Sequence, residues 1–378
     1  MLLSKLPDMK VIAWPAFKTR YANPYTWLLY SHMPEGVSVV EFSSKRLLLG
    51  RFDIFHLHWP VETLVRHPNL WVARLRVLIF WLLLKISRWR GTKVIWTIHD
   101  EKPHVVLHQR LADWFTQELI ANTDGCIHLC GAGRKAVNQS MPGLAKMPSF
   151  VVPHGHYRGC YPDTLNREDA RSQLALSPDA TVLLYLGYIS PYKNVPHLIN
   201  TFQALPPSDQ PVTLLIAGKA DSDEMKQAVL AAAEDADGIQ LHLRFIRDDE
   251  LQIFFKAADL VVLPFEEILN SGSLLLALSF DRPVLASHLG AVADWQAQIG
   301  ANWVNTYSGK LTPEVLAAAV QDRRSHAEKN RKKACQKADE KAPLDSLEWN
   351  AIAQQTLGAY QSTRKQPLNA PNTAQARP

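Results

Sequence analysis

The segment of residues 259–287, DLVVLPFEEILNSGSLLLALSFDRPVLAS, decides the fold class. It starts with an apolar run, passes through the capping residues Asn270 and Ser271 into a helical run, and closes with a second apolar run at 282–287. Two short buried strands joined by a helix form a βαβ unit, in which the strands are parallel. The segment therefore predicts an α/β domain built on a parallel sheet.

Apolar runs of the same kind recur along the whole chain. They lie at residues 10–14, 37–42, 53–59, 93–100, 125–131 and 150–155 in the first half, and at 181–189, 212–219, 239–245 and 301–307 in the second. Stretches of helical character separate most of them. The sequence therefore predicts two doubly wound, Rossmann-like parallel-sheet domains facing a central cleft.

A polar stretch with Gly and Pro after Tyr157 indicates the domain boundary. We expect an N-terminal domain over residues 1–157 and a C-terminal domain over 158–345. Residues 346–364 should form a helix that can pack back on the N-terminal domain, and the Pro-, Asn-, Gln- and Ala-rich residues 365–378 should be disordered. The cleft between the domains is the default ligand site.

The composition excludes several classes of protein. The 378 residues carry a formal charge of +5, which does not indicate a nucleic-acid partner. Cys126, Cys130, Cys160 and Cys335 fit neither a disulfide framework nor a zinc site, which favours reduced thiols in the cytoplasm. The longest apolar run, residues 77–84, is far shorter than the roughly 20 residues of a membrane span, so we expect no transmembrane segment.

Two loops at the carboxyl ends of predicted strands in the second domain carry candidate phosphate-binding groups. One opens a helix, where backbone N–H groups and the helix dipole attract an anion. The other presents a lysine that could neutralise a phosphate. Taken singly, the loops could be an ordinary capped helix and a solvated lysine, but both fall at the same sheet edge. The candidate residues are Gly187, Tyr192, Lys193, Asn270, Ser271, Gly272 and Ser273.

Histidines and carboxylates follow two strands of the first domain. His56 and His58 alternate with apolar residues and so face the same side of the sheet. Glu62, Asp100 and His58 are candidates for a catalytic base, in no order, and core polar groups with satisfied hydrogen bonds are the alternative. The spacing does not match a metal-binding helix, so we expect no metal site.

The residues between Glu62 and Asp100 include no acid and carry several cations interleaved with tryptophans. A helix of this kind can rest on an anionic membrane, and a crossover helix packed on the sheet is the alternative. The candidate membrane residues are Arg74, Arg76, Trp81, Lys85, Arg88, Trp89 and Arg90.

Five strings carry a resemblance to a known family: NPY at 23–25, HLHWP at 56–60, GHY at 155–157, PYK at 191–193 and NSGSLLLALS at 270–279. Together they resemble the xanthan-type bacterial β-mannosyltransferases and, more broadly, the two-domain GT-B glycosyltransferases. The similarity runs from about residue 23 to residue 307.

The resemblance implies a GT-B fold with no cofactor and no obligatory metal. It also implies that the second domain binds a nucleotide-diphospho-sugar, GDP-mannose, and the first a polyprenyl-diphosphate-linked acceptor, with inversion. Such an enzyme would act in exopolysaccharide synthesis, attached peripherally to the inner face of the plasma membrane. The candidate acceptor and cleft residues are Asn23, Tyr25, His56, Trp59, His99, His104, His156 and Tyr157.

The chain departs from the wider retaining GT-B pattern at two positions. That pattern has two glutamates eight residues apart, where this chain has Ile268 and Leu276, and Glu266 and Glu267 are near but shifted. The alternatives are therefore a retaining hexosyltransferase that uses a UDP-sugar, a non-catalytic sugar-nucleotide-binding or membrane-scaffolding protein, and a nucleotide-sugar epimerase.

Overall fold

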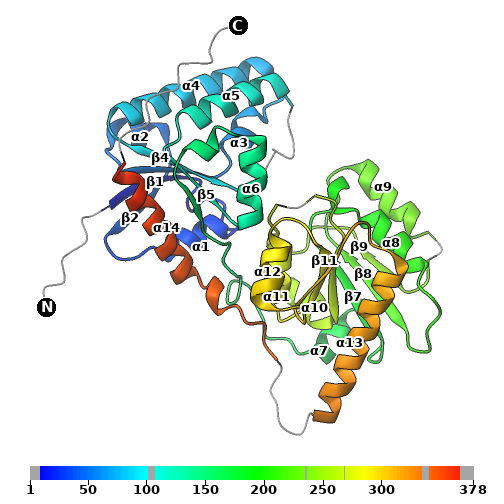
Figure 1. The fold of residues 1–378 in the computed structure, drawn as a ribbon. Helices are drawn as coiled ribbons and strands as arrows, with labels where there is room; N and C mark the ends of the chain where they lie inside the picture. The colour runs from blue at the N-terminus through cyan, green and yellow to red at the C-terminus, as the bar shows by residue number, and fades with distance from the viewer. Residues whose placement is uncertain (1–8, 101–106, 235, 268, 334–339, 367–378) are drawn as a thin grey trace, which may run out of the picture. The chain divides into compact units, whose positions relative to one another are not determined.

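A computed structural model describes residues 9–100, 107–234, 236–267, 269–333 and 340–366 (Figure 1). The chain divides into two compact units, one of residues 1–155 with 347–378 and the other of residues 156–346. Each unit contains a six-stranded sheet, and the strand pairs of both sheets are parallel. The predicted fold class, two doubly wound parallel-sheet domains, is confirmed.

The sheet of the first unit has the strand order β2-β1-β3-β4-β5-β6. Its strands are β1 (Met9–Trp14), β2 (Val37–Glu41), β3 (Ile54–Leu57), β4 (Lys93–Ile98), β5 (Gly125–His128) and β6 (Ser149–Val151). Each coincides with a predicted apolar run, but most end earlier at the carboxyl side, because the polar residues there leave the sheet and enter loops. His58 and His99 therefore lie just beyond their strands.

Helices cover this sheet. They are α1 (Tyr25–Ser31), α2 (Ser44–Leu49), α3 (Pro60–Val65), α4 (Leu70–Trp89), α5 (Gln109–Ala121), α6 (Gly131–Ser140) and α14 (Trp349–Arg364), with a short 3-10 turn η1 (Leu144–Lys146). Helix α14, red in Figure 1, packs against α1, β4 and β5 although it comes from the far end of the chain. A Cβ on Gly155 would lie 2.4 Å from Trp349 Cε2, so this packing requires glycine there.

The sheet of the second unit has the order β12-β11-β10-β7-β8-β9. Its strands are β7 (Thr181–Leu186), β8 (Val212–Ala217), β9 (Ile239–His242), β10 (Leu260–Leu263), β11 (Val284–Ser287) and β12 (Val304–Tyr307). Its helices are α7 (Arg167–Gln173), α8 (Val195–Gln203), α9 (Asp223–Ala232), α10 (Leu251–Ala257), α11 (Gly272–Ser279), α12 (Ala291–Ile299) and α13 (Pro313–Lys333), with 3-10 turns η2 (Pro191–Lys193) and η3 (Asp345–Leu347). Every residue of β7 and β10 is buried, as a two-sided parallel sheet requires.

Each sheet has one point where the strand order reverses. In the first unit the chain moves from β1 to β2 on one side and then to β3 on the other. In the second unit it moves from β7 through β8 to β9 and then crosses to β10. Ligands of doubly wound sheets bind outside the carboxyl ends of the strands at such points.

The structure contradicts one of the predicted membrane residues of helix α4, Arg88. The Arg88 side chain is buried, pairs with the Asp124 carboxylate and donates to the Asn122 carbonyl at 2.7 Å. The cation therefore serves the interior of the first unit, because a carboxylate and a carbonyl replace its water shell. None of the described helices is long and apolar enough to cross a membrane.

Candidate functional site

The loops that follow β7 and β10 meet at the point where the second sheet reverses. Gly187, directly after β7, has a φ of +151°. A Cβ built on it would lie 3.5 Å from both Lys193 Nζ and Ser273 Oγ. Two groups that are 80 residues apart in the sequence therefore lie beside the same glycine, and the loops predicted to share a sheet edge do so.

Backbone and side-chain hydrogen bonds hold these two loops together. The Glu266 N–H donates to the Tyr192 carbonyl at 2.8 Å. Asn194, in the left-handed conformation with a φ of +54°, donates from Nδ2 to Glu266 Oε1 at 3.0 Å. The Glu266 carboxylate is thus used to position the η2 turn. Leu276, at one of the two glutamate positions of the retaining pattern, is a half-buried residue of α11, and Ile268 lies outside the described residues.

Lys193 is a buried cation. Its side chain is only 9% exposed, and burial lowers its pKa to about 8. Nζ lies 5.4 Å from the ring centroid of Phe265 and 5.8 Å from that of Tyr192, where the ring faces attract a cation. No carboxylate of the described residues forms an ion pair with it. Lys193 is therefore not a solvated surface lysine, which was the alternative interpretation. A bound anion could supply the negative charge that the protein does not place beside it.

The start of α11 supplies further positive potential next to Lys193. Ser271 caps the helix, its Oγ accepting the Leu274 N–H at 3.1 Å. Within the described part of the chain, the N–H groups of Gly272 and Ser273 donate to no protein acceptor. The Tyr157 hydroxyl lies 3.2 Å from where a Gly272 Cβ would be, and the Tyr157 N–H donates to Ser279 Oγ at 2.8 Å. A lysine, a helix start and a tyrosine hydroxyl together can bind a phosphate or diphosphate.

In the first unit, the carboxyl ends of β3 and β4 carry a hydrogen-bonded cluster of histidines. The Tyr30 hydroxyl lies 2.8 Å from His56 Nδ1 and 2.6 Å from His58 Nε2. His58 Nδ1 lies 3.0 Å from His99 Nε2, and Trp59 stacks on the His99 ring with centroids 4.1 Å apart. These histidines lie at one sheet edge, as the sequence predicts. The sequence analysis does not identify Tyr30, whose hydroxyl joins them.

The histidine cluster is uncharged. Burial lowers the pKa of His56 to about 3. Burial, with His56 and His99 nearby, holds the pKa of His58 well below its usual value, and burial does the same for His99. Both ring nitrogens of His58 are hydrogen-bonded to protein groups, so neither is available to take a proton from a substrate. The arrangement suits a residue that positions its neighbours.

Further residues of the cluster come from distant parts of the chain. Tyr360 Oη on α14 lies 2.7 Å from His56 Nδ1, and Thr97 Oγ1 lies 2.7 Å from His56 Nε2. The Tyr25 ring packs against His154 with centroids 4.7 Å apart. Among the cluster residues that the sequence analysis does not identify, only His154 could have been recognised from the sequence, because it is a polar residue that follows a strand. Thr97 and Tyr360 look like ordinary core residues in the sequence.

The remaining predicted residues are distributed as follows. Asn23 Oδ1 accepts the Tyr25 N–H at 3.1 Å, which fixes the start of α1. Glu62 lies half-buried in the first turn of α3, and Asp100 lies half-buried just after β4. His156 is buried and belongs to the second unit. His104 lies outside the described residues.

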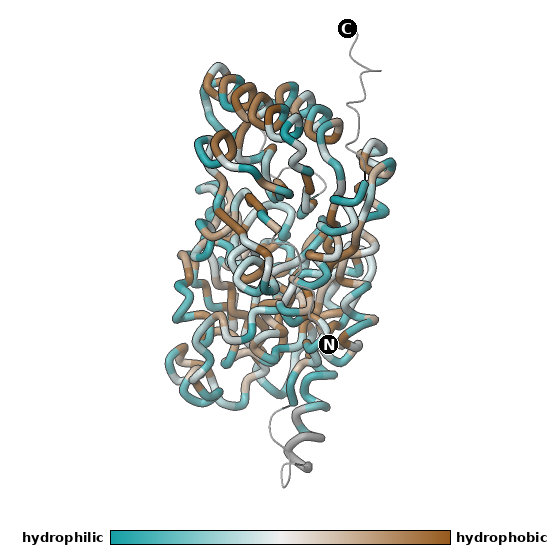
Figure 2. Tube along the Cα trace, turned by 90° about the vertical axis from the view of Figure 1, so that its left-hand side faces the viewer, coloured by the Kyte–Doolittle hydropathy of each residue, from teal (hydrophilic) through white to brown (hydrophobic). Residues whose placement is uncertain are grey.

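Helix α4 has an apolar outer face besides its buried inner face. Its exposed large apolar side chains are Trp71, Leu75, Leu78, Ile79, Leu82, Ile86 and Trp89. Arg74, Arg76 and Arg90 are exposed beside them, whereas Lys85 is half-buried and Trp81 donates from Nε1 to Glu118 Oε2 at 2.6 Å. The helices at the top of Figure 2, where Figure 1 places α4 and α5, show long brown stretches. We call these seven apolar residues the α4 stripe.

Comparison with known proteins adds three findings. Residues 180–322 match the family described as glycosyl transferases group 1. The GDP-mannose:glycolipid 4-beta-D-mannosyltransferase of Xanthomonas campestris pv. campestris is 31% identical over 302 residues, 79% of each chain. The lipopolysaccharide 1,2-N-acetylglucosaminetransferase of Salmonella typhimurium is 26% identical over 205 residues, 52% of this chain and 53% of that one.

Solved structures of the GT-B type share the fold of the chain. A glycosyltransferase from Rickettsia africae has a TM-score of 0.63 at 11% identity and covers 96% of this chain and 100% of its own. Anabaena HepE in complex with UDP and glucose has a TM-score of 0.57 at 18% identity and covers 94% and 98%. The predicted GT-B architecture is confirmed.

Replacing Lys193 by Met should weaken the binding of inorganic diphosphate by roughly 10- to 100-fold, the effect of losing a hydrogen bond from a charged group. The ammonium is charged below its pKa and neutral above it. The affinity of the unaltered protein should therefore fall as the pH rises through about 8, and the variant should lack this change. Calorimetric titration across this pH range measures both effects.

Lys226→Met, which removes an exposed lysine on α9, is the control and should bind inorganic diphosphate normally. Equal affinity of Lys193→Met and the unaltered protein would show that Lys193 is only a core residue.

Proposed function

The chain belongs to the group 1 glycosyltransferases, and we propose that it transfers mannose from GDP-mannose to a hydroxyl group of a glycolipid with inversion. The donor and the acceptor class are those that the name of the 31% identical Xanthomonas relative gives. The observation that carries the proposal is the buried Lys193 ammonium beside the start of α11, at the reversal point of the second sheet.

We assign the departing GDP to these groups. As the bond between the mannosyl C1 and the phosphate oxygen breaks, negative charge builds on the diphosphate. The Lys193 ammonium and the Gly272 and Ser273 N–H groups can stabilise that charge without reorganisation. This positive potential comes from the protein itself, so the proposed reaction requires no resident metal and no cofactor.

The acceptor hydroxyl must lose its proton as its oxygen bonds to C1, and this needs a base in the first unit. Glu62 and Asp100 are the stronger candidates, since both follow strands at the carboxyl edge of the sheet. His58 is the weaker one, because Tyr30 and His99 already occupy its ring nitrogens. A retaining reaction is disfavoured by Leu276, which stands at one of the two glutamate positions of that pattern.

We further propose that the enzyme works on the inner face of the plasma membrane, in exopolysaccharide synthesis. Large exposed apolar patches usually mark an interaction surface. The α4 stripe is flanked by Arg74, Arg76 and Arg90, which suits an anionic lipid surface better than a neutral protein partner.

Incubation of the purified protein with GDP-mannose should release GDP slowly by hydrolysis, and a glycolipid acceptor should accelerate the release. UDP-sugars should not react, and EDTA should leave the rate unchanged. Chromatography of the nucleotides measures all of these. Turnover of a UDP-sugar would favour the hexosyltransferase alternative, and binding without turnover would favour the scaffold.

Glu62→Gln and Asp100→Asn each exchange a carboxylate for an amide of similar shape. We expect one of them to slow mannosyl transfer by roughly 10²- to 10⁴-fold, the usual contribution of a general base, while GDP-mannose still binds. His58→Ala should instead lower the thermal unfolding temperature, because it leaves buried partners without hydrogen bonds. Near-normal transfer by both carboxylate variants would place the base elsewhere, and Glu266 and Glu267 would be tested next.

Vesicles that contain anionic lipid should bind the protein and release it as salt rises, because the attraction is screened over about 10 Å at 0.1 M salt. Arg74→Glu/Arg76→Glu should weaken this binding, whereas Arg134→Glu/Lys135→Glu, an exposed pair on α6, should change it little. Vesicle sedimentation measures the bound fraction. Equal binding to neutral and anionic vesicles would count against the membrane surface proposed here.

A further inference from the structure

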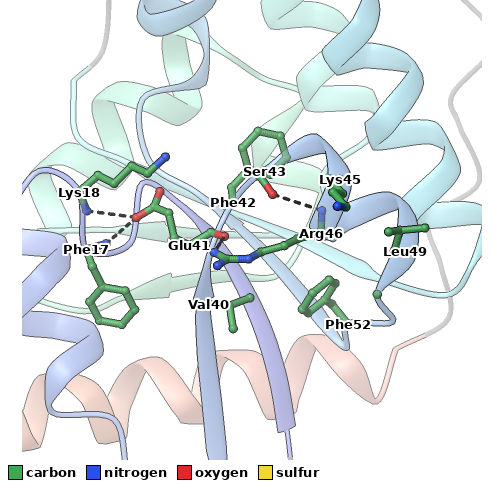
Figure 3. A pocket seen from close by; sticks show the side chains of 11 residues that line it. Phe17, Lys18, Val40, Glu41, Phe42, Ser43, Lys45, Arg46, Leu49 and Phe52 are labelled. Atoms are coloured by element: carbon green, nitrogen blue, oxygen red, sulfur yellow. Dashed lines mark hydrogen bonds between the residues drawn. The ribbon is translucent and has the colours of Figure 1, made fainter.

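A groove of about 1040 Å³ lies in the first unit, between the loop after β1, the end of β2 and helix α2 (Figure 3). Its lining combines cations with aromatic and aliphatic side chains. None of the residues assigned above to the donor, the base or the membrane lines it.

The groove carries a net positive charge. Glu41 is the only acid among the described residues that line it. Glu41 Oε2 accepts the N–H groups of Phe17 and Lys18 at 2.8 and 3.1 Å (Figure 3), and that of Ala16 at 3.1 Å. These hydrogen bonds commit the carboxylate to the backbone. No ion pair within the described residues neutralises Lys18 or Lys45, both of which are exposed.

Arg46 adds a third cation that is fixed in place. Its backbone N–H is capped by Ser43 Oγ at 3.2 Å, and its Nη1 donates to the Glu41 carbonyl at 2.9 Å (Figure 3). Three cations against one committed carboxylate match a ligand with negative charge, and phosphate is an anion that both lysine and arginine bind.

One side of the groove is apolar and opens onto the outer surface. Phe42 and Phe52 contribute rings to the lining, and Leu49, at the rim, is 77% exposed. Arg90, directly after α4, donates to the Leu48 carbonyl, so the rim of the groove lies next to the carboxyl end of α4. A ligand that is anionic at one end and apolar at the other fits this arrangement, whereas a free anion would leave the apolar wall unused.

The groove also lies beside the histidine cluster. It borders β1 on the β2 side, while His56 lies in β3 and His58 directly after it, on the other side of β1. The Phe17 ring, which lines the groove, packs against the Tyr30 ring with centroids 6.2 Å apart. The Tyr30 hydroxyl is in turn hydrogen-bonded to His56 and His58. A headgroup held in the groove would therefore lie close to the edge of the sheet where the base candidates lie.

We propose that this groove binds the phosphate-bearing headgroup of the glycolipid acceptor, with Lys18, Lys45 and Arg46 on the phosphate and Leu48 and Leu49 beneath the start of the alkyl chain. This inference rests on the proposed function and adds the position and the chemistry of the acceptor subsite. It predicts an enzyme that selects lipids whose glycan is joined through phosphate over neutral glycolipids.

The first test measures binding to the full-length protein by calorimetry, with dodecyl phosphate, inorganic phosphate and dodecyl maltoside as probes. Dodecyl phosphate should bind best, because it alone has both the charge and the chain. Lys18→Ala/Lys45→Ala should weaken its binding by roughly 10-fold or more, a loss of about 1.4 kcal/mol. Leu49→Asn should weaken it as well, without changing the binding of inorganic phosphate.

Lys146→Ala/Lys226→Ala removes two exposed lysines outside the groove and is the matched control, with unchanged binding expected. Binding of dodecyl phosphate that is equal in the groove variant and the control would overturn the proposal. Inorganic phosphate bound as tightly as dodecyl phosphate would also overturn it, since it would show a site for free anions.

The second test compares two acceptors that carry the same oligosaccharide, one joined to a dodecyl chain through phosphate and the other directly. Lys18→Ala/Lys45→Ala should raise the KM of the phosphate-linked acceptor and remove its advantage, with kcat and the slow hydrolysis of GDP-mannose unchanged. If the variant still prefers the phosphate-linked acceptor, the proposed role of the groove is wrong. Failure of the unaltered protein to turn over GDP-mannose would instead count against the proposed function, and the binding experiment would still decide about the groove.

Discussion

Parallel strands bring all of their carboxyl ends to one edge of the sheet, and the histidine cluster of the first unit and the Lys193 and Ser273 loops of the second lie at such edges. The reversal of strand order between β7 and β10 leaves room at that edge for the two loops that carry Lys193 and Ser273. Gly187 allows them to meet, since its φ of +151° is open to glycine and rarely to other residues. The chemistry of the second unit thus depends on strand order and on one backbone conformation.

The two units treat their buried polar groups in opposite ways. In the first, the buried His56 and His58 remain neutral and share hydrogen bonds with Tyr30, so the cluster is rigid and carries no charge. In the second, burial lowers the pKa of Lys193 only to about 8, so the ammonium stays largely charged at neutral pH. A buried cation without a carboxylate is costly, and an incoming diphosphate relieves that cost. The buried groups of the second unit therefore present positive charge, and those of the first unit present neutral hydrogen-bonding groups.

The surface of the first unit carries two exposed features, the α4 stripe and the cationic groove. Helix α4 fills the core with Val77 and Phe80 on its inner face and leaves the α4 stripe exposed on its outer face. The rim of the cationic groove adjoins the end of the same helix through Arg90 and Leu48. An amphiphilic substrate needs both an apolar surface for its chain and a polar site for its headgroup. Their proximity is the physical reason for proposing that the protein takes its acceptor from a membrane.

Within the described residues, the sequence by itself predicted the twelve strands, their parallel pairing and the shared sheet edge of the loops after β7 and β10, because capping residues and short apolar runs are local patterns. Only the tertiary structure decided which of these residues are buried and which partners they have. Arg88 looked like a surface cation until folding placed it against Asp124, and Lys193 looked like a loop lysine until two aromatic rings covered it. Tyr360 joins His56 across 304 residues of sequence, a contact that no local pattern encodes. Burial and pairing depend on chain segments far apart in the sequence, and these determine the charge and the reactivity of each group.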